Sequence, residues 1–428
     1  MAERWSSRLG FLLAAIGAAV GLGNIWRFSA VVGTNGGGAY LVPYLLAAFL
    51  FAVPLMILEL AVGRAFRVNV VSAFRKIRRQ FTILGWVVTG TVVLILSYYL
   101  VLTGWVLAFF LDALTGGSLT FGSFTRTLTP LAFFTLSTIL TAVIVSFGVK
   151  DGIERLASVV MPVIFLLLVL LALYATTLPG FSRAIAFLFQ PDFSVLGDPL
   201  LWSAAFGQVF FSLSVGQGIM LTYGSYIAEE TNLPRSALAI TIADIAVAIL
   251  AGLVIFPIVF TVGLEPALGT ELAFTTLPQA FTEMPFGSVV GIAFFGLLFF
   301  AALTSAVSLL EVGVAPVVAT TQLDRRRATI ILTGLVFLIG LPSALSYTSV
   351  SLTLDGVRVL DLMDETVGTL GLPVTAIIIS LVFGWYQDRD TLVNQLGHPI
   401  AIPLIRFVIP AVLVAVTAIK LFGRDFPA

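Results

Sequence analysis

The sequence predicts an all-α integral membrane protein, and three observations carry this prediction. Of the 428 residues, 59% are hydrophobic and only 10% are charged, whereas soluble domains carry about a quarter charged residues. A soluble fold of this length could not bury so much apolar surface. The apolar residues are also gathered in runs of the length that a helix needs to cross a bilayer, about 20 residues.

Eleven such runs are bounded by charged or turn residues, and they predict eleven transmembrane helices. The predicted spans lie near residues 9–33, 38–62, 82–111, 128–149, 157–178, 199–227, 236–262, 288–318, 328–348, 362–386 and 400–422. Residues 265–287 are too polar to span and are expected to form an outer loop that folds back over the protein. The short polar stretch before the first span does not have the form of a cleavable signal.

Lys and Arg residues are unevenly shared between the two sides of this arrangement. Most of the 22 lie in segments on the same side as the N-terminus, including the basic run at residues 75–79. Cytoplasmic loops carry an excess of Lys and Arg. The sequence therefore predicts a multi-pass protein of the cell membrane, with the N-terminus cytoplasmic and, after eleven spans, the C-terminus extracellular.

Several classes of function are disfavoured by composition. The formal net charge is zero, so nothing indicates a nucleic-acid partner. The chain contains no cysteine, which excludes disulfides and thiolate metal sites. Its one histidine, His398, cannot form a histidine-based metal site alone. No pairing of a nucleophile with a base is apparent, so the sequence does not predict an enzyme.

Two of the predicted spans are interrupted by glycine. The first contains Gly-Ala-Ala-Val-Gly-Leu-Gly-Asn at residues 17–24, and the sixth contains Phe-Phe-Ser-Leu-Ser-Val-Gly-Gln-Gly at 210–218. One glycine would usually serve helix packing, but a cluster weakens the helix locally. The two breaks are five spans apart, so the two helices run in opposite directions. Paired breaks of this kind mark the binding site of a secondary transporter.

Several motifs in and around these breaks occur together and in a fixed order. They are Arg8-Leu-Gly, Ala18-Ala-Val-Gly-Leu-Gly-Asn-Ile-Trp-Arg-Phe28, Asn35-Gly-Gly-Gly-Ala-Tyr-Leu-Val-Pro-Tyr44, Tyr98-Tyr99, Gln208-Val-Phe-Phe-Ser-Leu-Ser214 and Phe300-Ala-Ala-Leu-Thr-Ser305. They resemble the neurotransmitter:sodium symporter family, and eleven spans are typical of its prokaryotic branch. The resemblance covers essentially the whole chain.

This resemblance implies a fold and a function. The fold would be a single transmembrane domain over residues 1–428, with a 5+5 inverted repeat whose helices 1 and 6 are unwound in mid-membrane. Repeat one would cover about 9–178, repeat two about 199–386, and an eleventh helix about 400–422. The function would be sodium-coupled symport of a neutral, hydrophobic L-amino acid into the cell by alternating access. The expected partners are this amino acid and the bilayer, and the expected assembly is a monomer or a weak dimer.

The resemblance implies two sodium ions. Carbonyl oxygens freed by unwinding suit such a hard cation. The first site would consist of the Ala19 carbonyl, Asn24, Ser212 and Asp244, completed by the carboxylate of the substrate. The second would consist of the carbonyls of Gly17, Val20 and Ala301 and the hydroxyls of Thr304 and Ser305. A proton-coupled amino acid transporter, in which Asp244 or Glu311 titrates, and a non-transporting amino acid sensor remain alternatives.

Asp244 also bears on whether transport requires chloride. It lies within the apolar run 240–257, where a carboxylate is costly and is a functional candidate by default. Chloride-dependent members of the family carry a serine one helical turn later, where this chain has Ala248. A fixed carboxylate could supply the negative charge of the anion, so we predict that transport does not require chloride.

The resemblance also implies the substrate site. Monoamine carriers have an aspartate at the position of Gly21, so its absence favours a substrate that brings its own carboxylate. The residues implied to contact the substrate are Ala19, Gly23, Ile95, Tyr99, Phe211, Ser212, Ser214, Gln217, Ser305, Ser308 and Leu309. Gln217 and Ala18 depart from the family pattern and leave the identity of the amino acid open.

Two gates are implied as well. Arg27 and Asp364 would form an outer latch bridged by water, and Tyr226 would help to close the inner end. The inner ion pair of relatives maps onto Ala2 and Ala319, so both of its partners are missing. Arg4 is a candidate to replace one of them.

Overall fold

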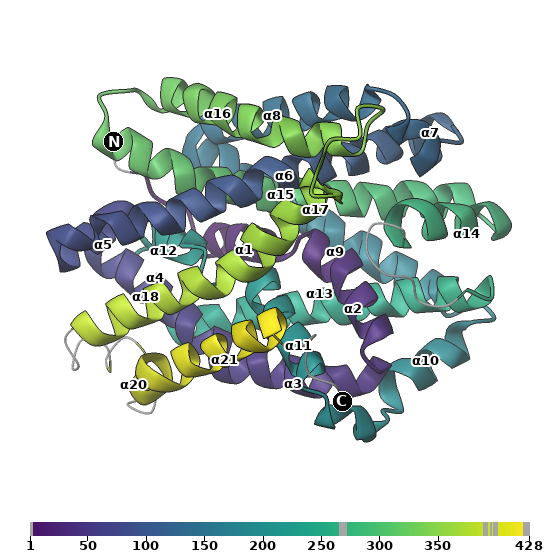
Figure 1. The fold of residues 1–428 in the computed structure, drawn as a ribbon, viewed down its shortest axis with the longest axis horizontal. Helices are drawn as coiled ribbons and strands as arrows, with labels where there is room; N and C mark the ends of the chain where they lie inside the picture. Colours follow the sequence, from purple (N-terminus) through teal and green to yellow (C-terminus); the bar gives the residue numbers. More distant parts are fainter. Residues whose placement is uncertain (1–2, 265–271, 388–392, 394–395, 397–400, 423–428) are drawn as a thin grey trace.

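Helices account for nearly all of the described chain. The computed structural model describes residues 3–264, 272–387, 393, 396 and 401–422. Many of its long helices lie roughly along the longest axis of the molecule (Figure 1). Within these ranges the β structure is one antiparallel pair of two-residue strands, β1 (Thr353–Leu354) and β2 (Val357–Arg358). The prediction of a mainly helical fold is therefore confirmed.

The first predicted span is an interrupted helix. α1 (Arg8–Ala19) begins after Ser7, whose hydroxyl caps it by accepting a hydrogen bond from the Gly10 amide. The chain then continues as a five-residue π-helix, η1 (Gly23–Arg27), and as α2 (Phe28–Thr34). The axis bends by 53° between α1 and the continuation. The helix is thus interrupted within the glycine cluster.

The sixth predicted span contains the second interruption. α11 (Pro199–Ser212) and α12 (Ile219–Gly224) are separated by residues 213–218. In this segment φ is 54° at Ser214, 82° at Gly216 and 72° at Gly218. Glycine adopts such left-handed backbone without steric cost, which explains two glycines in this short stretch. The location of both interruptions at the bilayer midplane stays a prediction.

The remaining helices complete the bundle. Before α11 they are η2 (Gly37–Tyr40), α3 (Leu41–Leu46), η3 (Ala47–Ala52), α4 (Val53–Phe66), α5 (Val70–Ile77), η4 (Arg79–Phe81), α6 (Thr82–Thr115), α7 (Phe121–Thr125), α8 (Thr129–Ser146), η5 (Val149–Glu154), α9 (Arg155–Ala175), α10 (Phe181–Phe189) and η6 (Phe193–Gly197). After α12 they are α13 (Leu233–Thr261), η7 (Leu272–Thr276), α14 (Leu277–Glu283), α15 (Gly287–Thr320), α16 (Arg325–Ser346), α17 (Val359–Met363), η8 (Asp364–Gly371), α18 (Leu372–Tyr386), α20 (Ala401–Pro403), η9 (Leu404–Val408) and α21 (Ile409–Phe422).

The predicted outer loop at 265–287 contains two of these short helices, η7 and α14. Phe281 of α14 packs edge-on against Phe294 of α15, with ring centroids 5.6 Å apart. The described part of the loop therefore folds back onto the protein. Residues 265–271 and His398 lie outside the described ranges.

The number of spans can be compared with the eleven predicted. Among the described residues, nine helices are long and apolar enough to cross a membrane, and the bent pair formed by α1 and its continuation adds a tenth. The two parts of the sixth predicted span, α11 and α12, have 14 and 6 residues. Neither is long enough alone to cross a bilayer, which takes about 20 residues. The count of eleven and the inverted repeat stay predictions.

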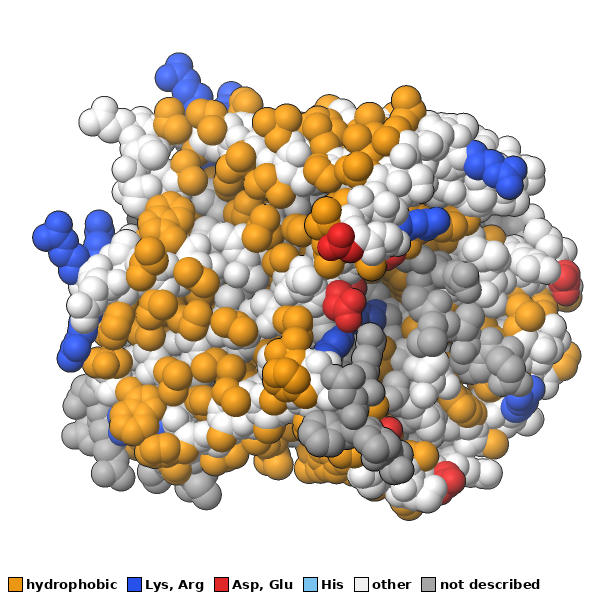
Figure 2. Space-filling model, in the orientation of Figure 1, with side chains coloured by type: hydrophobic (Ala, Val, Ile, Leu, Met, Phe, Trp, Pro, Cys, Tyr) orange, Lys and Arg blue, Asp and Glu red, His pale blue; other side chains and the backbone are white. Residues whose placement is uncertain are grey.

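The surface agrees with a protein surrounded by lipid. Figure 2 shows hydrophobic side chains spread across most of one face, with Lys and Arg side chains mainly toward its two ends. Large apolar side chains such as Val159, Leu166 and Ile330 are 63%, 59% and 66% exposed. Only an apolar solvent makes such exposure favourable over so wide an area.

Close packing against α4 holds α12, the second part of the sixth predicted span, in place. A Cβ atom on Gly63 of α4 would lie 2.0 Å from the carbonyl oxygen of Leu221. A Cβ atom on Gly224 of α12 would lie 2.6 Å from the carbonyl oxygen of Leu60. Small residues on both faces therefore let the two backbones approach, which is how helices commonly associate in membranes.

Candidate functional site

The end of α1 faces hydroxyl groups of α15. The Ser305 hydroxyl oxygen lies 3.5 Å from the carbonyl oxygen of Gly17 and 3.3 Å from that of Val20. The neighbouring Thr304 hydroxyl lies 3.0 Å from the carbonyl oxygen of Ala301. The last carbonyls of a helix have no partner within that helix. The five residues implied to form the second sodium site are thus brought together as a cluster of oxygen atoms.

A second cluster surrounds the buried carboxylate of Asp244 on α13. Asp244 is fully buried, and its Oδ1 accepts hydrogen bonds from the Ser212 hydroxyl at 2.9 Å and from Asn24 Nδ2 at 2.5 Å. The Tyr44 hydroxyl faces the same carboxylate. Gln208 Nε2 donates to the carbonyl oxygen of Gly23 at 2.7 Å. The cluster therefore ties both interrupted helices to α13.

The orientation of Asn24 differs from the predicted sodium ligation. Its amide oxygen accepts a hydrogen bond from the Gly21 amide at 3.0 Å, while its amide nitrogen faces Asp244 and Ser212. A carboxylate accepts from an NH2 group and repels a carbonyl oxygen, which accounts for this orientation. The roles of Asn24 and Ala19 as sodium ligands stay predictions.

A small cavity of about 30 Å³ lies between the two clusters. It is lined by Ala18, Ala19, Gly21, Gly23, Ile95, Tyr99, Phe211, Ser212, Ser214, Gln217, Ser305 and Leu309. The lining thus includes every residue predicted to contact the substrate except Ser308. Ser308 instead accepts a hydrogen bond from the Tyr223 hydroxyl at 2.7 Å and donates to the Thr304 carbonyl at 2.9 Å.

Polar groups reach this cavity from several elements. The Tyr99 hydroxyl accepts from the Leu22 amide at 3.4 Å, and the Ser214 hydroxyl donates to the Ala18 carbonyl at 2.8 Å. Gln217 is 4% exposed. Gly216 is held by its amide, which donates to Glu59 at 2.6 Å. Apolar walls with a few placed polar groups are typical of small-molecule sites.

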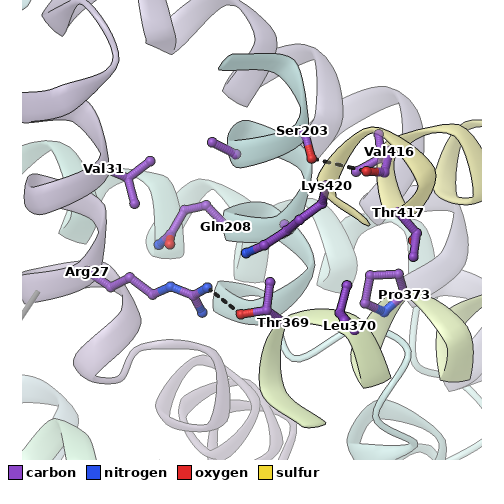
Figure 3. Close-up of a pocket in the computed structure, with 12 residues that line it drawn as sticks. Arg27, Val31, Ser203, Gln208, Thr369, Leu370, Pro373, Val416, Thr417 and Lys420 are labelled. Atoms are coloured by element: carbon purple, nitrogen blue, oxygen red, sulfur yellow. Dashed lines mark hydrogen bonds between the residues drawn. The ribbon is translucent and has the colours of Figure 1, made fainter. Parts of the chain in front are cut away.

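Arg27 lies on the outer side of this cavity and borders a second chamber. Its guanidinium is 4.5 Å from the centroid of the Phe211 ring, and its Nη2 donates to Thr369 at 3.4 Å. The chamber has a volume of about 110 Å³, and Figure 3 shows Arg27, Gln208 and Lys420 pointing into it. Arg27 Nη1 and Gln208 Oε1 are buried without a hydrogen-bond partner among the described residues. A chamber of this size and polarity has room for water.

Asp364 is connected differently from Arg27. Its Oδ1 accepts a hydrogen bond from the Tyr98 hydroxyl at 3.0 Å. Among the ion pairs formed by described residues there is none that joins Asp364 directly to Arg27. Thr369, which Arg27 contacts, follows Asp364 on η8. An indirect latch through η8 or water fits these contacts, and the gate role of the pair stays a prediction.

The end of the site nearer the N-terminus, which is predicted to be cytoplasmic and is called the inner end below, holds charged residues that the sequence reasoning did not bring together. Arg325 at the start of α16 forms a short ion pair with Glu311, which is fully buried, and a second ion pair with Glu3 at 3.2 Å. The Tyr226 hydroxyl donates to Glu311 Oε1 at 2.7 Å. Arg4, proposed as a substitute, is exposed and has no ion pair within the described residues. The ion pair at this end is instead formed by its neighbour Glu3, of opposite charge.

Glu154 anchors the same N-terminal segment to η5. It accepts hydrogen bonds from the Ser6 amide at 2.8 Å and the Ser6 hydroxyl at 2.5 Å. Trp5 Nε1 donates to the Tyr223 carbonyl at 3.0 Å. These partners are 148 and 218 residues apart in sequence, so no local pattern could have revealed them. The segment is thereby fastened to three parts of the inner surface.

The geometry defines a class of protein before any comparison is made. Two interrupted helices line one small cavity, with clusters of oxygen atoms beside it and charged contacts on either side. This is the architecture of a secondary transporter. The sequence pattern of the sodium:neurotransmitter symporter family matches residues 2–129 and 129–423, and the chain belongs to that family. The predicted family, and transport rather than catalysis, are thereby confirmed.

Individual relatives support the same conclusion. The chain is 37% identical over 408 residues to the sodium-dependent transporter YhdH of Bacillus subtilis, covering 92% of this chain and 90% of YhdH. It is 28% identical over 483 residues to sodium- and chloride-dependent GABA transporter 2 of Macaca fascicularis, covering 96% and 78%. The crystal structure of MhsT in complex with L-phenylalanine has a TM-score of 0.89 and 40% identity, covering 97% of this chain and 98% of MhsT.

Proposed function

We propose that this protein is a symporter that carries a neutral, hydrophobic L-amino acid into the cell by alternating access, driven by sodium. The observation that carries the proposal is the pair of oxygen clusters, at Ser305 and at Asp244, on either side of one cavity. Sodium is a hard cation that takes oxygen ligands, and broken helices supply them as free carbonyls. We assign one sodium ion to each cluster, which gives two.

The cavity supports an amino acid as the substrate. The amide of Gly23, at the start of η1, and the Tyr99 hydroxyl can bind a carboxylate, since helix N-termini attract anions. Among the described residues, no acidic side chain lines the cavity, so a substrate amine would face carbonyl oxygens. Ile95, Phe211 and Leu309 provide an apolar surface for the side chain. MhsT, 40% identical, holds L-phenylalanine in its crystal structure.

Chloride independence is part of the proposal. The related GABA transporters are named for dependence on both sodium and chloride. In this chain the Asp244 carboxylate is fully buried beside Ser212 and Tyr44. A fixed negative charge at this position can balance the charge of a bound cation, which is the contribution that an anion would otherwise make.

The placement in the membrane follows from the same proposal. We place the chain in the cell membrane as one domain of eleven spans, with repeat one at about 9–178, repeat two at about 199–386 and an extra helix at about 400–422. The N-terminus would be cytoplasmic and the C-terminus extracellular. Arg325, Arg326 and Arg327 at the start of α16 would then lie on the cytoplasmic side, in keeping with the positive-inside rule.

Uptake by the purified protein in proteoliposomes tests the function directly. We expect L-phenylalanine or another hydrophobic amino acid from a radiolabelled panel to accumulate when sodium is higher outside, and not when the gradient is absent. Accumulation driven by a proton gradient without sodium would support the proton-coupled alternative. Binding without accumulation under either gradient would identify a sensor.

Gly21 provides a test of the cavity itself. A Cβ atom there would lie 2.6 Å from Ser305 Oγ and 2.9 Å from the Tyr99 hydroxyl. We expect Gly21→Ala to weaken substrate binding by about tenfold or more, because overpacking costs about 1–3 kcal/mol. Binding of radiolabelled substrate to detergent-solubilised protein measures the effect. Gly90→Ala on α6 is the matched control, since a Cβ atom there meets nothing within 4 Å. Equal affinities for both variants would contradict this location of the site.

A further inference from the structure

A groove on the lipid-facing side of the bundle lies between α8 and α16, far in sequence from the transport site. The two helices lie side by side at one edge of the molecule (Figure 1). Only 33% and 44% of their most apolar segments is buried inside the protein. The groove has a volume of about 440 Å³ and is formed by these two helices alone. It therefore opens toward the membrane.

The walls of the groove are apolar along its length. Ile139, Val143 and Ile330 line it and are 52%, 48% and 66% exposed. The hydroxyls of Thr135 and Thr138 donate to carbonyls of their own helix at 2.8 and 2.7 Å, so they present little polarity to a ligand.

The floor of the groove has a gap and an unpaired polar atom. A Cβ atom on Gly334 would meet nothing within 4 Å. Thr333, 5% exposed, lines the groove, and its hydroxyl has no hydrogen-bond partner among the described residues.

The two ends of the groove differ. At one end, Phe337 stacks on the buried Phe134 with ring centroids 4.9 Å apart. At the other end stands Arg326. Arg326 and Phe337 are eleven positions apart, which corresponds to about 16 Å of helix. This is about half the thickness of the hydrocarbon core, or one leaflet. The groove is thus one leaflet deep, apolar along its length and cationic at its mouth.

The charge of Arg326 is not balanced by any described residue. Of the three consecutive arginines, Arg325 pairs with Glu311 and Glu3, and Arg327 pairs with Asp324 at 3.4 Å. Arg326 is exposed and forms no ion pair with any described residue. An unpaired cation at the membrane surface attracts anionic headgroups.

We propose that the groove between α8 and α16 is a binding site for one anionic phospholipid of the cytoplasmic leaflet. An acyl chain lies along Ile139, Val143 and Ile330, over Gly334, and ends against Phe337. The headgroup phosphate pairs with Arg326. Because Arg325 belongs to the inner ion-pair network, the bound lipid also fixes the start of the helix that carries this network.

Lipid binding to the intact protein tests the proposal. The probes are phosphatidylglycerol and phosphatidylcholine with the same acyl chains, titrated into delipidated protein in detergent and counted by native mass spectrometry. We expect one phosphatidylglycerol to bind more tightly than phosphatidylcholine. Arg326→Gln should reduce this preference about fivefold, the equivalent of one interfacial arginine. Arg327→Gln, whose arginine already pairs with Asp324, should leave the preference unchanged.

A second variant addresses the apolar part of the groove. Gly334→Leu places a side chain in the gap, where a Cβ atom meets nothing within 4 Å, and we expect it to weaken binding of both lipids at this site. Equal loss of preference in Arg326→Gln and Arg327→Gln would overturn the proposal in favour of diffuse surface charge. Unchanged lipid binding in Gly334→Leu, together with a change from dimer to monomer, would overturn it in favour of an interface between two copies of the chain.

Discussion

Replacing Asp244 with Ala is expected to weaken sodium binding by about 100-fold or more. The carboxylate is fully buried and holds Ser212 and Asn24 by hydrogen bonds of 2.9 and 2.5 Å. Removal of one member of a buried, charge-compensated group costs about 3–5 kcal/mol, equivalent to about two to nearly four orders of magnitude in affinity. The sodium dependence of substrate binding to purified protein measures this effect.

The isosteric change Asp244→Asn separates charge from shape. It keeps hydrogen-bonding groups toward Asn24 and Ser212 but removes the negative charge. We expect this variant to lose sodium affinity in chloride-free buffer and to recover part of it when chloride is added. The sodium affinity of the wild type should be the same with and without chloride. Asp192→Asn, at an exposed cap of η6, is the control for a carboxylate outside the site. A sodium affinity equal to that of the wild type in both Asp244 variants would rule out Asp244 as a sodium ligand.

The interruptions of the first and sixth spans were predictable from sequence because their cause is local. Glycine weakens a helix wherever it occurs, and Gly216 and Gly218 do adopt positive φ. The meeting of these interruptions with α13 and α15 is not local. Ser305 lies 288 residues from Gly17, and their proximity was expected only because the motifs resemble those of a known family.

The inner ion-pair network of Arg325, Glu311 and Glu3 could not be predicted from the resemblance to the family. The family pattern pointed to Ala2 and Ala319, where both charges are missing, and then to Arg4 as a substitute. In the structure the ion pair is formed by Glu3, whose partner Arg325 lies 322 residues away in sequence. A surface glutamate near a chain terminus has no periodicity or spacing that distinguishes it from a solvated charge. Only the folded structure, which places Arg325 beside the buried Glu311, shows that Arg325 is also the partner of Glu3.

Replacing Arg325 with Ala is expected to shift the protein toward an arrangement that is open to the inside. The substitution leaves the buried carboxylate of Glu311 without its cation and releases Glu3 from α16. An unpaired buried charge costs about 3–5 kcal/mol, and opening the inner end relieves this cost by admitting water. Sodium-driven uptake should fall strongly, because the closed state that follows substrate binding is disfavoured. Substrate binding itself should be retained, because Arg325 does not line the cavity.

The absence of cysteine from the chain makes this shift directly measurable. Ala15→Cys places one thiol on the fully buried face of α1, and its rate of labelling by a water-soluble thiol reagent reports inner access. We expect Arg325→Ala to raise this rate about tenfold or more. Glu3→Gln should raise it only about two- to fivefold, because that ion pair is partly exposed. Arg327→Ala should not change it. A labelling rate that stays at the wild-type value in Arg325→Ala would mean that the hydrogen bonds of Glu154 and Trp5 hold the inner end closed without the ion pairs.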